Sequence, residues 1–287
     1  MSYLVRSSSE KIKDQNHYLA NFIKETMSMN FFNEGITSLV FREGWVSVSY
    51  QNGSVKEIVL PEVLEELRCS HNQLTRLEGL PKSLKVLSCP SNDLTALENL
   101  PEGLKVLNCT QNRLTSLRSL PAGLELLWCS YNQLTALDDL PKNLRELYCS
   151  GNRLATLGSL PVGLVGLSCS NNLFTSLEPL PIGLKKLWCS GNWFTRLEGL
   201  PEGLEELHCS SIPSLEYIEP SPKNFKYLAV PDHLKEKYSS YPVLHRSYLD
   251  HQTFKQSLVT LLALEGLGFL TLENLSKSLD DEFKSSF

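Results

Sequence analysis

Hydrophobic positions recur along the middle of this chain with a constant period of twenty residues. Leu-Pro stands at residues 60–61 and at every twentieth residue from there to 200–201. Each interval between two Leu-Pro pairs repeats the same apolar positions, which in the first unit are Leu64, Leu67, Cys69, Leu74 and Leu77. Eight units cover residues 60–219 without an insertion or a deletion. A constant short period predicts one structural unit per repeat, with successive units stacked into a solenoid.

The pattern within one unit predicts a short strand followed by an extended return segment. Leu67 and Cys69 alternate with polar residues, so both side chains face the same side of a strand. One unit cannot bury its apolar residues alone, but parallel stacking at about 4.8 Å per unit buries them continuously. Twenty residues leave no room for a helix on the convex side. Pro61 and its equivalents, whose rings restrict φ to the extended and polyproline region, favour an extended path there.

Two polar or weakly polar columns accompany the leucines, and both predict a structural role. An asparagine follows each strand in seven units, and its amide is expected to bond the backbone groups left free where the chain leaves the sheet. In the eighth unit this position is Ile212. The cysteines recur once per unit from Cys69 to Cys209. We expect them to be small buried apolar residues, because parallel strands orient thiols poorly for disulfides and no ligand spacing suggests a metal site. Eight reduced thiols favour a reducing compartment.

The repeat unit LPxxLxxLxCSxNxLTxLxx resembles the bacterial LPX subfamily of leucine-rich repeats, found in effectors of the YopM and IpaH kind. The resemblance implies a leucine-rich-repeat solenoid of the α/β class, with one short parallel strand per coil, and a host-cell protein as the target. Cysteine replaces the usual inward isoleucine or valine. One branch of this family carries a ubiquitin-ligase domain with a cysteine nucleophile. All eight cysteines here lie in the repeats, so a scaffold without that domain is expected.

The segments outside the repeats are expected to cap the solenoid. Residues 1–35 are predicted to carry a helical cap, with an amphipathic helix from Glu10 to Asn30. Residues 36–59 are predicted to form a degenerate first coil, with strands at 36–41 and 45–50 and Asn52 in the asparagine column. Residues 220–245 are predicted to be a degenerate last coil and linker, and 246–287 a helical cap or small helical domain. The acidic end at 278–287 resembles translocation signals of Legionella-type secreted effectors.

The net charge and the hydropathy of the chain limit the kinds of partner that it is expected to bind. The net charge of −5 gives no basic stripe for nucleic acid. The longest apolar stretch, residues 258–272, is too short to span a membrane. No classical signal peptide precedes the repeats. With the resemblance above, these features favour a protein of the bacterial cytoplasm that is then translocated into the host cytosol.

The concave sheet is the predicted site for a host or cellular protein partner, because large apolar side chains are expected to be exposed on it. The candidate partner-binding residues are Val86, Val106, Leu126, Trp128, Tyr131, Tyr148, Trp188, Trp193 and His208. A neutral surface that tolerates such residues is the alternative interpretation. No catalytic or metal-binding pattern stands out and no cofactor is expected, so a non-enzymatic scaffold is predicted. The alternative is the substrate-recognition part of an enzyme, or a ubiquitin-ligase adaptor, acting through the C-terminal helices.

Overall fold

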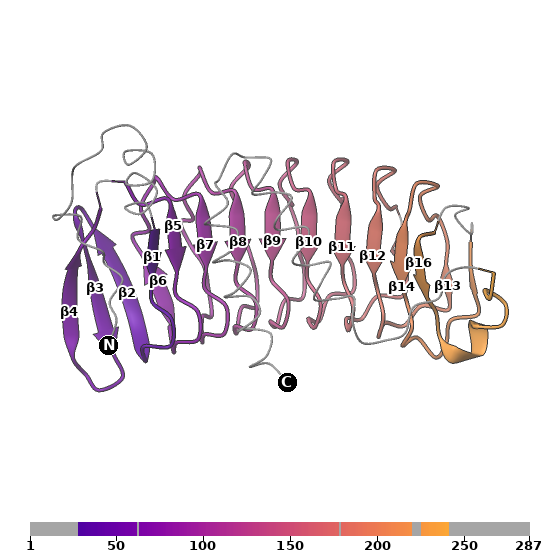
Figure 1. The fold of residues 1–287 in the computed structure, drawn as a ribbon, viewed down its shortest axis with the longest axis horizontal. Helices are drawn as coiled ribbons and strands as arrows, with labels where there is room; N and C mark the ends of the chain where they lie inside the picture. The colour runs from indigo at the N-terminus through magenta and orange to yellow at the C-terminus, as the bar shows by residue number, and fades with distance from the viewer. Residues whose placement is uncertain (1–27, 62, 178, 220–224, 241–287) are drawn as a thin grey trace, which may run out of the picture. The chain divides into compact units, whose positions relative to one another are not determined.

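The computed structural model describes residues 28–61, 63–177, 179–219 and 225–240. These residues belong to the first of two units in the chain, Met1–Pro242, and the second unit is Val243–Phe287. The described part is dominated by a ten-stranded parallel sheet, in which successive repeats lie side by side (Figure 1). Its strands, in order, are β1 (Ser28–Asn30), β5 (Glu66–Arg68), β7 (Val86–Ser88), β8 (Val106–Asn108), β9 (Leu126–Trp128), β10 (Glu146–Tyr148), β11 (Gly166–Ser168), β12 (Lys186–Trp188), β14 (Glu206–His208) and β16 (Tyr227–Ala229).

The repeat period sets the register of this sheet. Leu67 pairs with Leu87 and Leu147 with Leu167, so equivalent residues of neighbouring coils stand beside each other. The leucines at these positions and the cysteines two positions later are buried on the same side. All eight cysteines are free and buried, which confirms their predicted role as core residues. Several thiols, such as that of Cys109, donate to a carbonyl of the next strand, here Trp128 O at 3.4 Å.

The asparagine column is a structural ladder, as predicted. Asn132 is typical: its Nδ2 donates to Cys109 O, Cys129 O and Ser130 O, at 3.0, 3.1 and 3.2 Å. Its Oδ1 accepts from Leu114 N at 3.0 Å. The side chain therefore links its own coil to the preceding one, where both have left the sheet. Buried backbone groups that would otherwise lack partners are satisfied in this way.

The N-terminal end is built from strands where the sequence analysis expected a helix and a coil. Residues 28–30, the end of the predicted helix, form β1 and pair with β5. The rest of that helix lies outside the described residues. A second sheet has the order β4-β3-β2-β6, from β2 (Ile36–Arg42), β3 (Trp45–Tyr50), β4 (Val55–Val59) and β6 (Arg76–Glu78). In it β2, β3 and β4 are antiparallel, and β2 runs parallel to β6.

The coil that precedes the array therefore begins before residue 36. Asn72 bonds this coil, with Nδ2 donating to Phe31 O at 2.6 Å and Oδ1 accepting from Ile36 N at 3.1 Å. Asn52 does not occupy the asparagine column, since its Oδ1 accepts from Ser54 N at 2.9 Å in the turn between β3 and β4. The two strands and the turn were predicted correctly. Their antiparallel pairing turns them into a hairpin sheet at the end of the array.

At the other end the repeat register slips by one position. Leu207 pairs with Leu228, one position beyond the repeat period, and Phe225, Leu228 and Val230 are buried. Two short strands, β13 (Arg196–Leu197) and β15 (Tyr217–Ile218), pair on the return side of the last coils. The one helix among the described residues is the 3-10 turn η1 (Asp232–Leu234). Helical caps are thus not supported here, and the helices expected at 246–287 lie outside the described residues.

Candidate functional site

The outer face of the ten-stranded sheet is the surface turned away from the buried leucines and cysteines. Each strand contributes two outward positions, which are Glu66 and Arg68 in β5 and their equivalents in the following strands. Because the strands pair in register, these positions form two continuous rows across the sheet. Seven of the nine candidate residues from the sequence lie in these rows: Val86, Val106, Leu126, Trp128, Tyr148, Trp188 and His208.

Four rings on the outer face make one continuous aromatic row. Trp128 and Tyr148 meet edge to face, with ring centroids 6.1 Å apart. Tyr148 and Trp188 stack at 6.3 Å, although they lie two strands apart. Trp188 in turn stacks on His208 at 5.7 Å. The row spans β9 to β14, and ring pairs of this geometry are worth about 1 kcal/mol each beyond the area they bury.

Two small residues on β11 allow the aromatic row to continue from β10 to β12. Its two outward positions are Gly166 and Ser168, so no large side chain separates Tyr148 from Trp188. The Ser168 hydroxyl lies 2.8 Å from that of Ser150. These two small residues were not among the candidates predicted from the sequence. A signal was present, because β11 alone among the eight repeat strands has a small residue at both positions.

The side chains of the outer face are buried, where the sequence analysis expected an exposed apolar patch. Leu126 is 0% and Trp128 2% exposed, and the exposed fractions of Val86, Val106, Tyr148 and Trp188 are 7%, 3%, 9% and 4%. The expectation of exposure was therefore wrong for these six. The residues around them are half-buried, among them Arg68, Ser168 and His208. The outer face thus carries a buried apolar stretch, and its polar side chains range from buried, as at Asn108 and Glu206, to half-buried.

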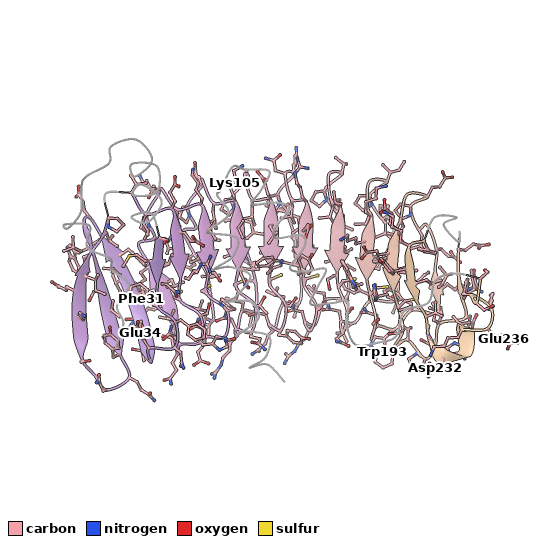
Figure 2. The ribbon with its side chains drawn as sticks, in the orientation of Figure 1. Phe31, Glu34, Lys105, Trp193, Asp232 and Glu236 are labelled. Atoms are coloured by element: carbon pink, nitrogen blue, oxygen red, sulfur yellow. The ribbon has the colours of Figure 1, made fainter. Side chains whose placement is uncertain are left out.

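The other two candidates lie at the edge of the sheet and are exposed. Tyr131 follows β9 in a turn with φ of 53°, and 55% of it is exposed. Its ring covers Gly151, where an added Cβ would come within 2.6 Å of Tyr131 Cδ1. Trp193 is 64% exposed and lies beyond the ends of the strands, on the opposite edge from Lys105 (Figure 2). Neither residue belongs to the aromatic row.

Two buried polar atoms near the end of the aromatic row have no hydrogen-bond partner within the described part of the chain. They are Trp188 Nε1, a donor, and Glu206 Oε2, an acceptor. The other carboxylate oxygen of Glu206 lies 3.6 Å from Lys186 Nζ. Burial raises the pKa of Glu206, and the nearby Lys186 partly offsets this. An unsatisfied buried polar group costs about 1–3 kcal/mol, so a ligand that bonded these atoms would recover that energy.

The thiols offer no reactive centre. Burial raises the pKa of Cys109 to about 12, and it also raises the pKa of Cys69, Cys129, Cys149, Cys169, Cys189 and Cys209. A thiol with so high a pKa is protonated near neutral pH and is a poor nucleophile. Elsewhere in the described ranges, no group of three or more His, Cys, Asp or Glu side chains is placed to hold a metal ion.

No helix in the described residues has the length and apolar character needed to cross a membrane. The same part of the protein has a hollow of about 840 Å³ lined by residues of the segments 96–102 and 116–122. None of the nine candidate residues lines this hollow. It is therefore separate from the aromatic row.

The comparison with family models agrees with the geometry of the coils. A model described as Leucine Rich Repeat matches residues 143–167, most of one unit of the array and the beginning of the next. That stretch contains β10 and the start of β11, which pair in the repeat register described above. The fold is a leucine-rich-repeat solenoid.

Solved structures place this leucine-rich-repeat solenoid close to bacterial effectors. YopM from Yersinia enterocolitica is 35% identical with a TM-score of 0.54, over 60% of this chain and 39% of that one. The leucine-rich effector protein YopM from Yersinia pestis is 30% identical with a TM-score of 0.54, over 58% of this chain and 54% of that one. The solenoid therefore spans about half or less of the length of these relatives. A search of curated proteins found no match.

Proposed function

We propose that this leucine-rich-repeat protein is a non-enzymatic scaffold that binds a host protein on the outer face of its ten-stranded sheet. The observation that supports this proposal best is the aromatic row, which ends beside Trp188 Nε1 and Glu206 Oε2, two atoms that no other described residue bonds. Tryptophan and tyrosine dominate the energetics of protein interfaces. Rings held by their neighbours lose little conformational freedom on binding, which lowers the entropic cost of association.

The role of a secreted bacterial effector is part of the same proposal. It is supported by the likeness to the YopM proteins of two Yersinia species. The YopM protein from Yersinia pestis is described as a leucine-rich effector protein. A Legionella-type origin and translocation from the bacterial cytoplasm into the host cytosol remain part of the proposal. The proposal includes no chemistry at cysteine, because all eight thiols are buried in the array.

The test of the docking face uses two arginine substitutions in the same coil. Ser168→Arg places a long charged side chain over the gap between Tyr148 and Trp188 on the outer face. Val162→Arg is the matched control, because Val162 is 87% exposed and precedes β11 in the loop. The full chain and both variants are used to capture proteins from host-cell lysate, with identification by mass spectrometry.

The expected result is one partner that the wild type and Val162→Arg capture and that Ser168→Arg loses by at least about tenfold, since a desolvated charge at the centre of an interface costs about 1.4 kcal/mol or more. Equal capture by Ser168→Arg would place the partner elsewhere and refute the docking face. Circular dichroism spectra and melting temperatures of the two variants verify that both are folded.

A further inference from the structure

The strand β4 leaves one edge of the hairpin sheet open. It is the first strand in the order β4-β3-β2-β6 and lies at the indigo end of the row (Figure 1). Within the residues that the structure describes, β4 pairs with β3 alone. An unpaired strand edge is a template for another strand, and natural proteins usually protect such edges. β4 contains no proline, and three of its five residues, Val55, Glu57 and Val59, lie on one exposed face.

The hydrogen bonds of the hairpin show which backbone groups face this open edge. Leu60 N donates to Gly44 O and Tyr50 N donates to Ser54 O, both at 2.9 Å. In an antiparallel pair, hydrogen-bonded and non-hydrogen-bonded residue pairs alternate. The residues at 56 and 58 therefore bond β3, whereas Val55, Glu57 and Val59 turn their N–H and C=O groups outward. The open edge thus offers three donors and three acceptors to a strand added beside it.

The side chains on this face define the chemistry of an added strand. Val55 is 63% and Val59 78% exposed, and both are apolar. Glu57 lies between them, is also exposed, and pairs with Ser47 across the hairpin. Directly opposite residues on an antiparallel pair interact most strongly, and opposite charges stabilise the pair. An added strand is therefore expected to carry a basic residue opposite Glu57 and apolar residues two positions away on each side.

A second copy of this chain fits the edge poorly. The antiparallel register that uses all three outward residues of both strands pairs Glu57 with the same residue of the other copy. Like charges placed directly opposite each other destabilise a strand pair. We propose that β4 accepts an extended antiparallel segment of a different protein, with a lysine or arginine opposite Glu57 and apolar residues opposite Val55 and Val59. This surface is separate from the outer face of the ten-stranded sheet.

The test uses the full chain and two blocked, fluorescein-labelled peptides. One has the sequence Thr-Val-Thr-Lys-Thr-Val-Thr, and its twin has glutamate in place of lysine. Binding is measured by fluorescence anisotropy for the wild type, Glu57→Lys and Glu57→Pro. We expect the wild type to bind the lysine peptide about fivefold more tightly than the glutamate peptide, from one cross-strand ion pair. Glu57→Lys is expected to reverse that preference.

Glu57→Pro is expected to abolish binding of both peptides, because proline removes an outward donor and its ring blocks the edge. It leaves the β3–β4 hydrogen bonds intact, since the Glu57 N–H does not take part in them. A circular dichroism spectrum confirms that the variant is folded, and Glu57→Lys keeps the test decisive if it is not.

Several outcomes would overturn the inference. They are no binding of either peptide, no preference between the two, or unchanged binding by folded Glu57→Pro. Slow hydrogen exchange of the Val55, Glu57 and Val59 amides in the free monomer would show that this chain already occupies the edge. A dimer in sedimentation velocity that Glu57→Pro dissociates would show that a second copy does.

Discussion

Alkaline pH is expected to unfold this protein through its buried cysteines. Seven of the eight thiols have a pKa raised by burial above the ordinary value of 9.0. Above pH 9 the unfolded chain loses these protons, whereas the folded chain keeps them. The unfolded state then binds fewer protons, so the free energy of unfolding falls as pH rises. The contribution of the thiols to stability is complete below pH 9 and is lost above it.

The size of the effect follows from the number of thiols. Each one lowers the free energy of unfolding by about 1.4 kcal/mol per pH unit between its unfolded and folded pKa values. For seven thiols the slope approaches about 10 kcal/mol per pH unit, against a total stability of about 5–15 kcal/mol for a typical domain. We therefore expect unfolding between about pH 9 and pH 11, below the pKa of about 12 that Cys109 has in the folded protein.

The assay is urea unfolding, followed by far-ultraviolet circular dichroism, at several pH values from 7 to 10.5 in the presence of a reductant. Cys129→Ala is the informative variant, because it removes one thiol from the middle of the array. Lysines and tyrosines titrate equally in both proteins, so the difference in slope isolates that thiol. The variant is expected to lose stability at pH 7 through its cavity, and its slope above pH 9 is expected to be shallower by about 1.4 kcal/mol per pH unit.

Two results would refute this reasoning. Identical slopes for the wild type and Cys129→Ala would mean that the thiol does not titrate differently in the folded and unfolded states. Rapid reaction of the native protein with a thiol reagent at pH 7.5 would mean that the cysteines are not sealed in the array.

Two further predictions concern the ladder and the N-terminal sheet. Asn132→Ala removes four hydrogen bonds to the backbone and is expected to lower the free energy of unfolding by about 3 kcal/mol, as measured in urea. The control is Thr135→Ala, at an exposed neighbouring position, which should change the free energy of unfolding little. Equal effects of the two substitutions would contradict the structural role of the asparagine ladder. Gly79→Ala and Gly158→Ala both strain a positive φ, but only at Gly79 would the new Cβ collide with a backbone oxygen, that of Phe41. We expect Gly79→Ala to lower the free energy of unfolding by about 2 kcal/mol more than Gly158→Ala does, and to reduce the protection of backbone amides in β2 from hydrogen exchange. Similar losses of stability in the two variants would argue against the close approach of Gly79 to Phe41.

The repeats themselves were predictable because each coil obeys a local pattern. Leu67 and Cys69 alternate with outward residues over three positions, and the alternation alone assigns their direction. The role of the asparagine follows from the backbone groups that any coil leaves free when it exits the sheet. Both arguments need only one unit and its translation by one repeat period. The register of the sheet and the burial of the cysteines follow from them.

The structure of the two ends of the array depends on contacts between residues that lie far apart in the sequence, so a local pattern did not predict it. Asn52 lies one repeat period before Asn72, yet it forms part of a turn, because its strands pair with each other as a hairpin. Met29 was assigned to a helical pattern, but β1 gains a ladder of backbone bonds from β5 and buries this side chain at the end of the core. Pairing of this kind outweighs local propensity where an open coil must be covered.

The direction in which a side chain points and the extent to which it is buried are different properties. The sequence determined that Leu126 and Trp128 point away from the core of the repeats, since alternation along a strand is a local matter. Only the tertiary structure decided how closely their surroundings enclose them, and that Tyr148 and Trp188 meet across the gap at β11. The physical reason for that contact is that stacking brings side chains one and two repeats apart along the chain next to each other.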